Sequence, residues 1–272
     1  MVEPITTVGL GAVAAYLSKD GIAKLLGPTA DYLGNGLLDF TKRRSENIGR
    51  IFQKASEKLG DRIEVPGEVP PRVLKAVINE GSYCDDELAA EYFGGVLASS
   101  RTEQGRDDRG ARIAKVLDGL STYQIRAHYL IYATIKQTFT DANLLFNMEG
   151  RPKMQIFLPF TGFVSSMEFS KAEINQFGQL LNHIFFGLAA DSLIDPFWQY
   201  GPQETIVKMC KTAKDGGIVC QPSAIGAELF LWAFGRADQP LEYIFDASFV
   251  PTVNNCPLSV PGACTAITDG QT

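Results

Sequence analysis

The side chains best suited to catalysis or metal binding are sparse in this sequence and stand apart from one another. Only two histidines occur, His128 and His183, and each lies within a strongly apolar segment of helical spacing. A histidine can serve as a general base or a metal ligand. Neither histidine has a carboxylate or a cysteine at ligand spacing beside it. We therefore expect both to be satisfied residues of the core or its boundary.

The cysteines give no stronger signal for chemistry. They are scattered, odd in number and without a C-x-x-C pair, which indicates reduced thiols and no zinc site. The five are Cys84, Cys210, Cys220, Cys256 and Cys264. Phosphate-binding, nucleophile-elbow, zinc-protease and dinucleotide motifs do not occur either. The sequence thus predicts no enzyme, no cofactor and no metal site.

What remains is a line of positive charge along one long helix, predicted from Gly27 to Leu59. Arg43, Arg50, Lys54 and Lys58 follow one another at steps of seven, four and four, so they stack on one helix face. Such a face could bind phosphates, anionic lipid headgroups or an acidic partner. It could equally be a solvated face that acids elsewhere in the fold balance. The four residues form the candidate interaction site.

This basic helix stands in an otherwise acidic protein. The chain has 272 residues and a formal net charge of −6, with 45% hydrophobic and 21% charged residues. Positions 41 to 58 contain six basic residues and only two acidic ones. General nucleic-acid binding is disfavoured by the overall charge. The helix also interleaves no aromatic side chains with its cations, as single-strand binding would require.

The elements that must position this helix are themselves mostly helical. We expect a mainly α fold, with an N-terminal bundle around the long helix over residues 1–115. A helical, winged-helix-like part with some β structure follows over 116–245, and an irregular tail over 246–272. The first helix of the bundle, predicted over 6–26, is rich in small residues that permit close helix contact.

Helix starts are the best-defined local signals. Ser121 with Gln124, and Ser170 with Glu173, have capping-box spacing. The helix that follows Ser170 is expected to bury Ile174. The other predicted elements are helices over 72–79, 87–99, 204–213 and 224–234, short strands over 62–65 and 218–221, and split strand material over 154–164.

Three stretches taken together resemble the abortive infection alpha (Abi-alpha) family of bacterial proteins. They are Leu26-Gly27-Pro28-Thr29-Ala30-Asp31-Tyr32-Leu33-Gly34, then Val69-Pro70-Pro71-Arg72-Val73-Leu74 leading into Asp85-Asp86-Glu87-Leu88 and Val96-Leu97-Ala98, then Ile218-Val219 with Gly226-Ala227-Glu228-Leu229-Phe230. Their order and spacing cover roughly residues 20 to 235. The sequence departs from the resemblance at Gly94-Gly95, where bulkier residues are expected, and in the tail after Phe245.

The resemblance implies a bacterial antiphage context and carries over no catalytic residues. We expect a cytoplasmic defence component, peripheral at the inner membrane when activated, that binds an anionic membrane surface or a protein partner, which could be a second copy. Two alternatives stay open. One is a winged-helix DNA-associated regulator, although the candidate recognition helices are poor in Arg and Lys. The other is an immunity or antitoxin-like protein whose acidic surface masks a basic toxin.

Overall fold

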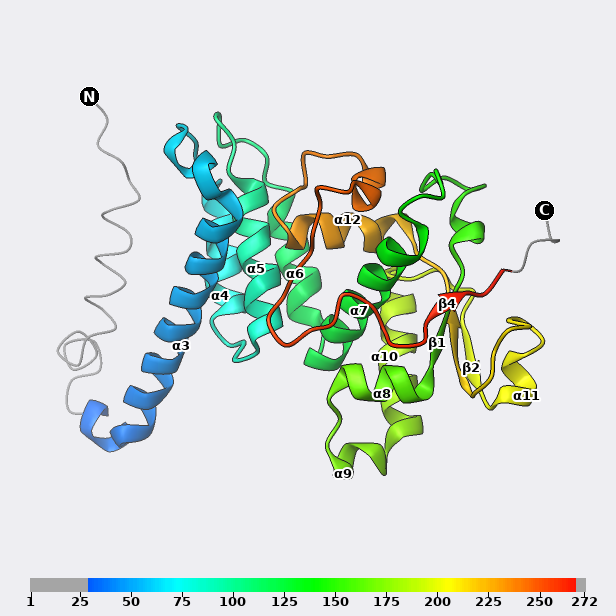
Figure 1. The fold of residues 1–272 in the computed structure, drawn as a ribbon. Coiled ribbons are helices and arrows are strands. Elements are labelled where there is room, and N and C mark those ends of the chain that lie inside the picture. The colour runs from blue at the N-terminus through cyan, green and yellow to red at the C-terminus, as the bar shows by residue number, and fades with distance from the viewer. Residues whose placement is uncertain (1–28, 268–272) are drawn as a thin grey trace.

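The chain folds mainly into α-helices, with one small antiparallel sheet (Figure 1). The computed structural model describes residues 29–267, so the predicted helix over 6–26 lies outside the described residues. The helices are α3 (Thr29–Leu59), α4 (Pro71–Gly81), α5 (Glu87–Ser100), α6 (Gly110–Gly119), α7 (Thr122–Phe139), α8 (Phe160–Met167), α9 (Lys171–Ile174), α10 (Phe177–Ala190), α11 (Gln203–Ile206) and α12 (Ala224–Ala233). The 3-10 turns are η1 (Gly60–Glu64), η2 (Arg151–Met154) and η3 (Leu241–Phe245). The expectation of a mainly α protein is confirmed.

The sheet combines strands from distant parts of the second half of the chain. Its order is β2 (Gln199–Gly201), β3 (Gly217–Cys220), β1 (Ile156–Pro159) and β4 (Cys264–Thr265), all antiparallel. Ile156 pairs with Cys220 on one side and with Thr265 on the other. The two central strands, β1 and β3, are buried along their full length. The segment after η3 therefore runs back across the molecule to add β4 (red in Figure 1).

Helix α5 lies between α3 and α12, and a glycine pair permits both contacts. A Cβ on Gly94 would lie 2.6 Å from the Lys54 Cβ and 2.9 Å from the Ile51 carbonyl oxygen on α3. A Cβ on Gly95 would lie 1.9 Å from the carbonyl oxygen of Ala233 on α12. Bulkier residues at these positions would push the neighbouring helices away. The departure from the family resemblance at Gly94-Gly95 therefore has a structural reason in this chain.

The predicted helix boundaries hold where side chains cap the backbone. Both capping boxes are present, from Ser121 to Gln124 and from Ser170 to Glu173. Helix α12 is confirmed and ends as predicted, because Gly235 has a φ of +71° and the Arg236 N–H donates to the Leu231 carbonyl at 2.9 Å.

Several other predictions were wrong. Only 156–159 of the segment 154–164 is a strand, because Pro159 is the residue from which the chain turns into α8. Of the predicted helix over 204–213, only residues 204–206 are α-helical, as the end of α11 (Gln203–Ile206). The predicted strand over 62–65 lies mostly in η1 and forms no strand. The helix after Ser170 stops after one turn and restarts at Phe177, so Ile174 is 45% exposed instead of buried. Helix α6 was not predicted.

One hydrophobic core runs through both halves of the described chain. It extends from Ile51 on α3 to Val260 in the final segment, and includes Tyr92 on α5, Tyr129 on α7 and Trp232 on α12. The predicted division at residue 115 thus falls inside a continuous cluster of buried side chains. That division into domains remains a prediction.

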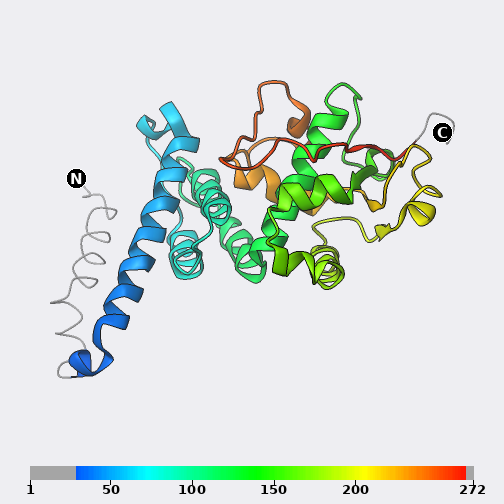
Figure 2. The ribbon, with the colours of Figure 1, turned by 60° about the horizontal axis from the view of Figure 1, so that its bottom comes forward.

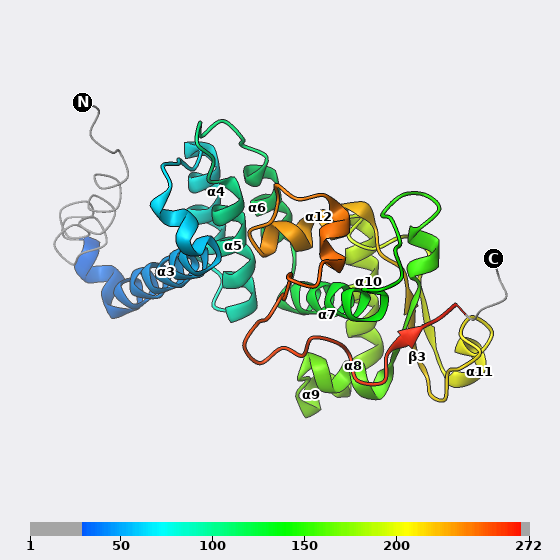
Figure 3. The same ribbon diagram turned by 45° about the horizontal axis from the view of Figure 1, so that its top comes forward.

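Helix α3 lies at the end of the molecule opposite the sheet. In Figures 1 and 2 its first turns extend past α4 and α5, whereas its last turns lie against them. Figure 3 shows the same helix running along the outside of α4 and α5. Within residues 29–267 no helix combines the length and the apolar character needed to cross a bilayer.

Candidate functional site: the charged interface of α3 and α5

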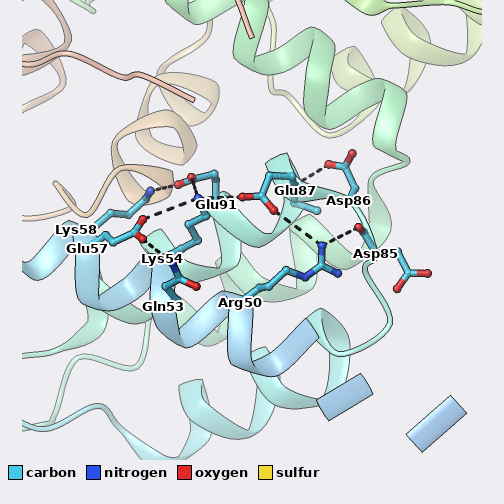
Figure 4. A network of polar contacts seen from close by, with 10 residues as sticks. Arg50, Gln53, Lys54, Glu57, Lys58, Asp85, Asp86, Glu87 and Glu91 are labelled. Atoms are coloured by element: carbon cyan, nitrogen blue, oxygen red, sulfur yellow. Dashed lines mark hydrogen bonds and ion pairs between the residues drawn. The ribbon is translucent and has the colours of Figure 1, made fainter. Parts of the chain in front are cut away.

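The predicted basic stripe is directed largely into the protein's own structure. Lys54 and Lys58 lie one helical turn apart on α3, and Glu87 and Glu91 lie one turn apart on α5. Because the two helices pack side by side, the two pairs meet (Figure 4). The interface is therefore a set of opposite charges placed at matching helical steps.

Lys54 and Glu91 form the buried centre of this interface. The Lys54 Nζ lies 2.7 Å from the Glu91 Oε1 and 2.9 Å from the Glu87 Oε1. Only 8% of Lys54 and 5% of Glu91 are exposed. Burial opposes the charge on Lys54, but its hydrogen bonds to Glu91 and Glu87 outweigh burial and raise its pKa. Lys54 is thus held as a cation inside the fold.

Lys58 completes a buried triad with the same carboxylate. Its Nζ pairs with the Glu91 Oε2, and it lies 5.3 Å from the centre of the Phe234 ring. One carboxylate therefore accepts from two lysines through its two oxygens. A buried charge whose partner is removed costs about 3–5 kcal/mol, whereas the intact pair contributes far less net stability. Removal of Glu91 should therefore cost more stability than the intact triad contributes.

Arg50 and Asn47 extend the polar contact toward the start of α5. The Arg50 Nη1 donates to the Asp85 carbonyl at 3.1 Å and lies 3.9 Å from Glu87. Asn47, 3% exposed, donates to the Ser82 carbonyl at 3.0 Å and to the Asp85 Oδ1 at 2.9 Å. These bonds satisfy polar groups in the turn between α4 and α5. The α3 helix is thus tied to that turn as well as to α5.

Arg43 is the one member of the stripe that points away from this network. It is exposed and pairs with no carboxylate of residues 42–267. Sequence steps of seven, four and four place it in line with the other three, but it is the last turns of α3 that lie against α4 and α5 (Figures 1 and 2). The structure therefore brings Arg50, Lys54 and Lys58 together and leaves Arg43 outside.

The acidic half of the interface was not identified from the sequence. Glu87 and Glu91 were seen only as part of a helix, although their four-residue step matches that of Lys54 and Lys58. The glycine pair just after Glu91 is the second signal, since it permits another backbone to approach α5 closely. Matching charge steps beside a glycine pair would have predicted this helix contact.

His128 is a structural residue at the centre of the fold. Its ring nitrogens bond the Tyr92 hydroxyl at 2.8 Å and the Gly226 carbonyl oxygen at 3.0 Å, and it is fully buried. Burial lowers its pKa to about 3, and the bond to Gly226 offsets only part of that effect. The expectation of a satisfied core histidine is confirmed. His183, by contrast, lies at the surface with its Nε2 2.8 Å from the Ser121 hydroxyl.

Within residues 29–267 the remaining polar groups form no site for a metal. No group of three or more His, Cys, Asp or Glu side chains in that range is arranged to hold an ion. The five cysteines are free thiols, and burial raises the pKa of Cys84 to about 11 and that of Cys220 to about 12.

Comparison of the chain with protein-family models, curated proteins and solved structures gave no match.

Proposed function

We propose that this chain is a binding protein of a bacterial antiviral system of the abortive-infection type, and that it acts by contacting a protein partner through α3. The observation that carries the proposal is the asymmetry of this helix. Its second half is anchored to α5 by a buried Lys54–Glu91–Lys58 triad, and its first turns extend past α4 and α5 (Figures 1 and 2). The defence context comes from the family resemblance.

A protein partner is favoured over an anionic membrane as the target of α3. Peripheral membrane binding draws on cations that are free to reach lipid headgroups. Lys54 and Lys58 would have to abandon a buried carboxylate to do so. Near the exposed Arg43, Lys42 lies 3.9 Å from Glu46 and Arg44 lies over the Tyr83 ring, so part of the local positive charge already has a partner within the chain.

The winged-helix regulator is the less favoured alternative. Of the two candidate recognition helices, the one that contains Lys171 is the single turn α9. The other is α12, whose Leu229, Phe230 and Trp232 are at most 1% exposed. A helix covered on most sides has no face to insert into a DNA groove.

The test is phage challenge of a bacterial host that expresses the full chain. Wild type should lower phage plating, and the double variant Lys42→Glu with Arg43→Glu should lose that protection while keeping the wild-type melting temperature. Gly36→Pro, which interrupts the extended turns of α3, should lose it as well. The matched control is Arg112→Glu with Lys115→Glu on the exposed face of α6, which should retain protection.

Three outcomes would contradict the proposal. Wild type that never protects would remove the defence role. Protection that survives both α3 variants would remove α3 as the contact. Binding of the purified protein to phosphatidylglycerol vesicles, lost in the Lys42 and Arg43 double variant, would replace the protein partner with a membrane.

A further inference from the structure

A hollow of about 540 Å³ opens to solvent beside the edge of the sheet, far along the chain from α3. It lies where α10, β2 and α11 meet, at the end of the molecule opposite α3 (Figures 1 and 3). The residues of interest in its lining are Phe160, Phe177, Leu181, Tyr200, Glu204 and Asp215. It thus joins three aromatic rings to two carboxylates.

The aromatic walls are held in place by their neighbours. Phe160 and Phe177 pack edge to face with ring centres 5.2 Å apart, and Phe169 supports Phe177 from 6.2 Å. Tyr200 stacks on Trp198 at 6.1 Å, and its hydroxyl donates to the Asn182 Oδ1 at 2.5 Å. A site whose rings are already ordered loses little side-chain entropy when a ligand binds.

Backbone close packing fixes the floor of the hollow. The Phe160 N–H donates to the Gly216 carbonyl at 2.9 Å. A Cβ on Gly216 would lie 3.0 Å both from the Phe160 ring and from the Gly201 carbonyl oxygen. The ring of Phe160 therefore rests directly on the strand ends, and its position is set by them.

The charge of the lining has one sign. Glu204 lies in the first turn of α11, and Asp215 caps its own turn by accepting from the Gly216 N–H at 2.8 Å; both are exposed. No Lys, Arg or His stands among the described residues that line the hollow, and the neighbouring Lys214 is not part of the lining. The charged side chains that a ligand meets in this lining are therefore both acidic, and they stand beside three aromatic rings.

We propose that this hollow binds a small organic ammonium ion, with the rings of Phe160, Phe177 and Tyr200 around its apolar groups and with Glu204 and Asp215 balancing its charge. Aromatic faces attract cations because the face of the ring carries partial negative charge, and the attraction is stronger where water is excluded. An anion would be repelled, and a neutral apolar ligand would gain nothing from the two carboxylates. The site is independent of the role proposed for α3.

The experiment is calorimetric titration of the full chain with choline and with 3,3-dimethylbutan-1-ol, its uncharged isostere. Choline should bind at one site, and the alcohol should bind at least about tenfold more weakly, the ratio expected from about 1.4 kcal/mol of cation–π and charge attraction. Equal affinity for the two, or no saturable choline binding at millimolar concentration, would overturn the proposal.

Variants assign the binding to this hollow. Glu204→Gln with Asp215→Asn should weaken choline about threefold to tenfold and leave the alcohol unaffected. Tyr200→Leu should weaken choline by a similar factor. The control is Glu103→Gln, an exposed carboxylate in the loop between α5 and α6, which should leave choline affinity unchanged. Choline affinity that falls equally in the control, or that persists in both site variants, would also overturn the assignment.

Discussion

Helix α5 approaches a neighbouring helix closely on each of two faces, and the side chains around the two contacts differ in chemistry. Toward α3 the close approach at Gly94 is accompanied by a buried lysine–carboxylate triad and by Asn47. Toward α12 and α7 the close approach at Gly95 is accompanied by aromatic side chains and by the bond between Tyr92 and His128. The α3 contact thus combines a charged triad with apolar residues of the core such as Ile51 and Ala55. The α12 contact is apolar and part of the continuous core.

The two contacts differ in how much large apolar surface they bury. Removing α12 from α5 would expose Phe230 and Trp232, which are fully buried. Moving α3 would expose fewer large apolar side chains, of which Ile51 is the most buried, and its charged groups would regain water. A contact made by charges at matching steps also specifies register, because a shift by one residue separates every pair. The α3 contact therefore depends on register more strongly than the α12 contact does.

The largest expected loss of stability comes from substitution of Gly95, and it should exceed the loss from substitution of Gly94. Gly95→Ala should destabilise the protein by about 3 kcal/mol or more, because the new methyl meets the Ala233 carbonyl. Gly94→Ala should cost about 1–2 kcal/mol, since its closest contacts, 2.6 Å to the Lys54 Cβ and 2.9 Å to the Ile51 carbonyl oxygen, are less severe than the 1.9 Å contact at Gly95. Urea unfolding of each variant measures the difference. Gly49→Ala on α3, with nothing within 4 Å, is the control and should be neutral or slightly stabilising.

The second prediction concerns acid stability and the α12 side. His128 is buried, and its pKa in the folded protein is about 3. Between about pH 3 and the ordinary histidine pKa, the ring is therefore protonated in the unfolded chain and neutral in the folded one. Stability contributed by the neutral ring is present above about pH 6.5 and is lost as the pH falls toward 3. Between about pH 6 and pH 4 the free energy of unfolding of wild type should fall faster than that of His128→Gln, by about 1.4 kcal/mol per pH unit. Parallel curves for the two proteins would show that His128 is not held neutral.

The third prediction concerns the contact between α3 and α5. Glu91→Gln should cost about 2 kcal/mol, because Lys54 and Lys58 lose their shared carboxylate while Lys54 keeps Glu87. Glu57→Gln is the matched control, since Glu57 is exposed and lies 3.8 Å from the same lysine, and should change stability by less than about 0.5 kcal/mol. Equal losses in the two variants would mean that the triad does not place α3.

The smallest effect is expected at the edge of the same interface. Arg50 lies 3.9 Å from Glu87 and is partly exposed, so Arg50→Gln should cost less than about 1 kcal/mol. The cost should shrink further at high salt, because exposed charges are screened. Thermal unfolding at low and high ionic strength measures both. A loss as large as that of Glu91→Gln would move the anchor of α3 from Lys54 to Arg50.

The parts of the fold that could be predicted are those specified by local chemistry. The caps at Ser121, Ser170 and Gly235 depend on residues within a few positions, so their patterns suffice. The break between α9 and α10 and the start of α8 after Pro159 depend on distant partners, such as Gly216 for Phe160 and Tyr123 for Glu173. No local pattern contains those partners.

Only the basic half of the α3–α5 interface could be predicted from the sequence. The alignment of the cations on α3 follows from helical spacing. Whether they contact α5 depends on which face of α3 packs against it, and that packing also involves Ile51, Ala55 and Gly94. A stripe with free positive charge and a stripe neutralised by a neighbouring helix look the same in the sequence. The hollow beside β2 is assembled from four separate segments of the chain, and no one of these segments shows a pattern that would predict it.

Hydrogen–deuterium exchange along α3 of the full chain, in wild type and in Glu91→Gln, tests the central claim most directly. In wild type the amides over residues 47–59 should be protected nearly as well as those of α5, and the amides over 29–43 should exchange faster. In Glu91→Gln protection should fall over 47–59 while α5, α7 and α12 keep theirs. Uniform protection of α3 that the variant does not change would contradict an α3 helix anchored by charge at one half and extended at the other.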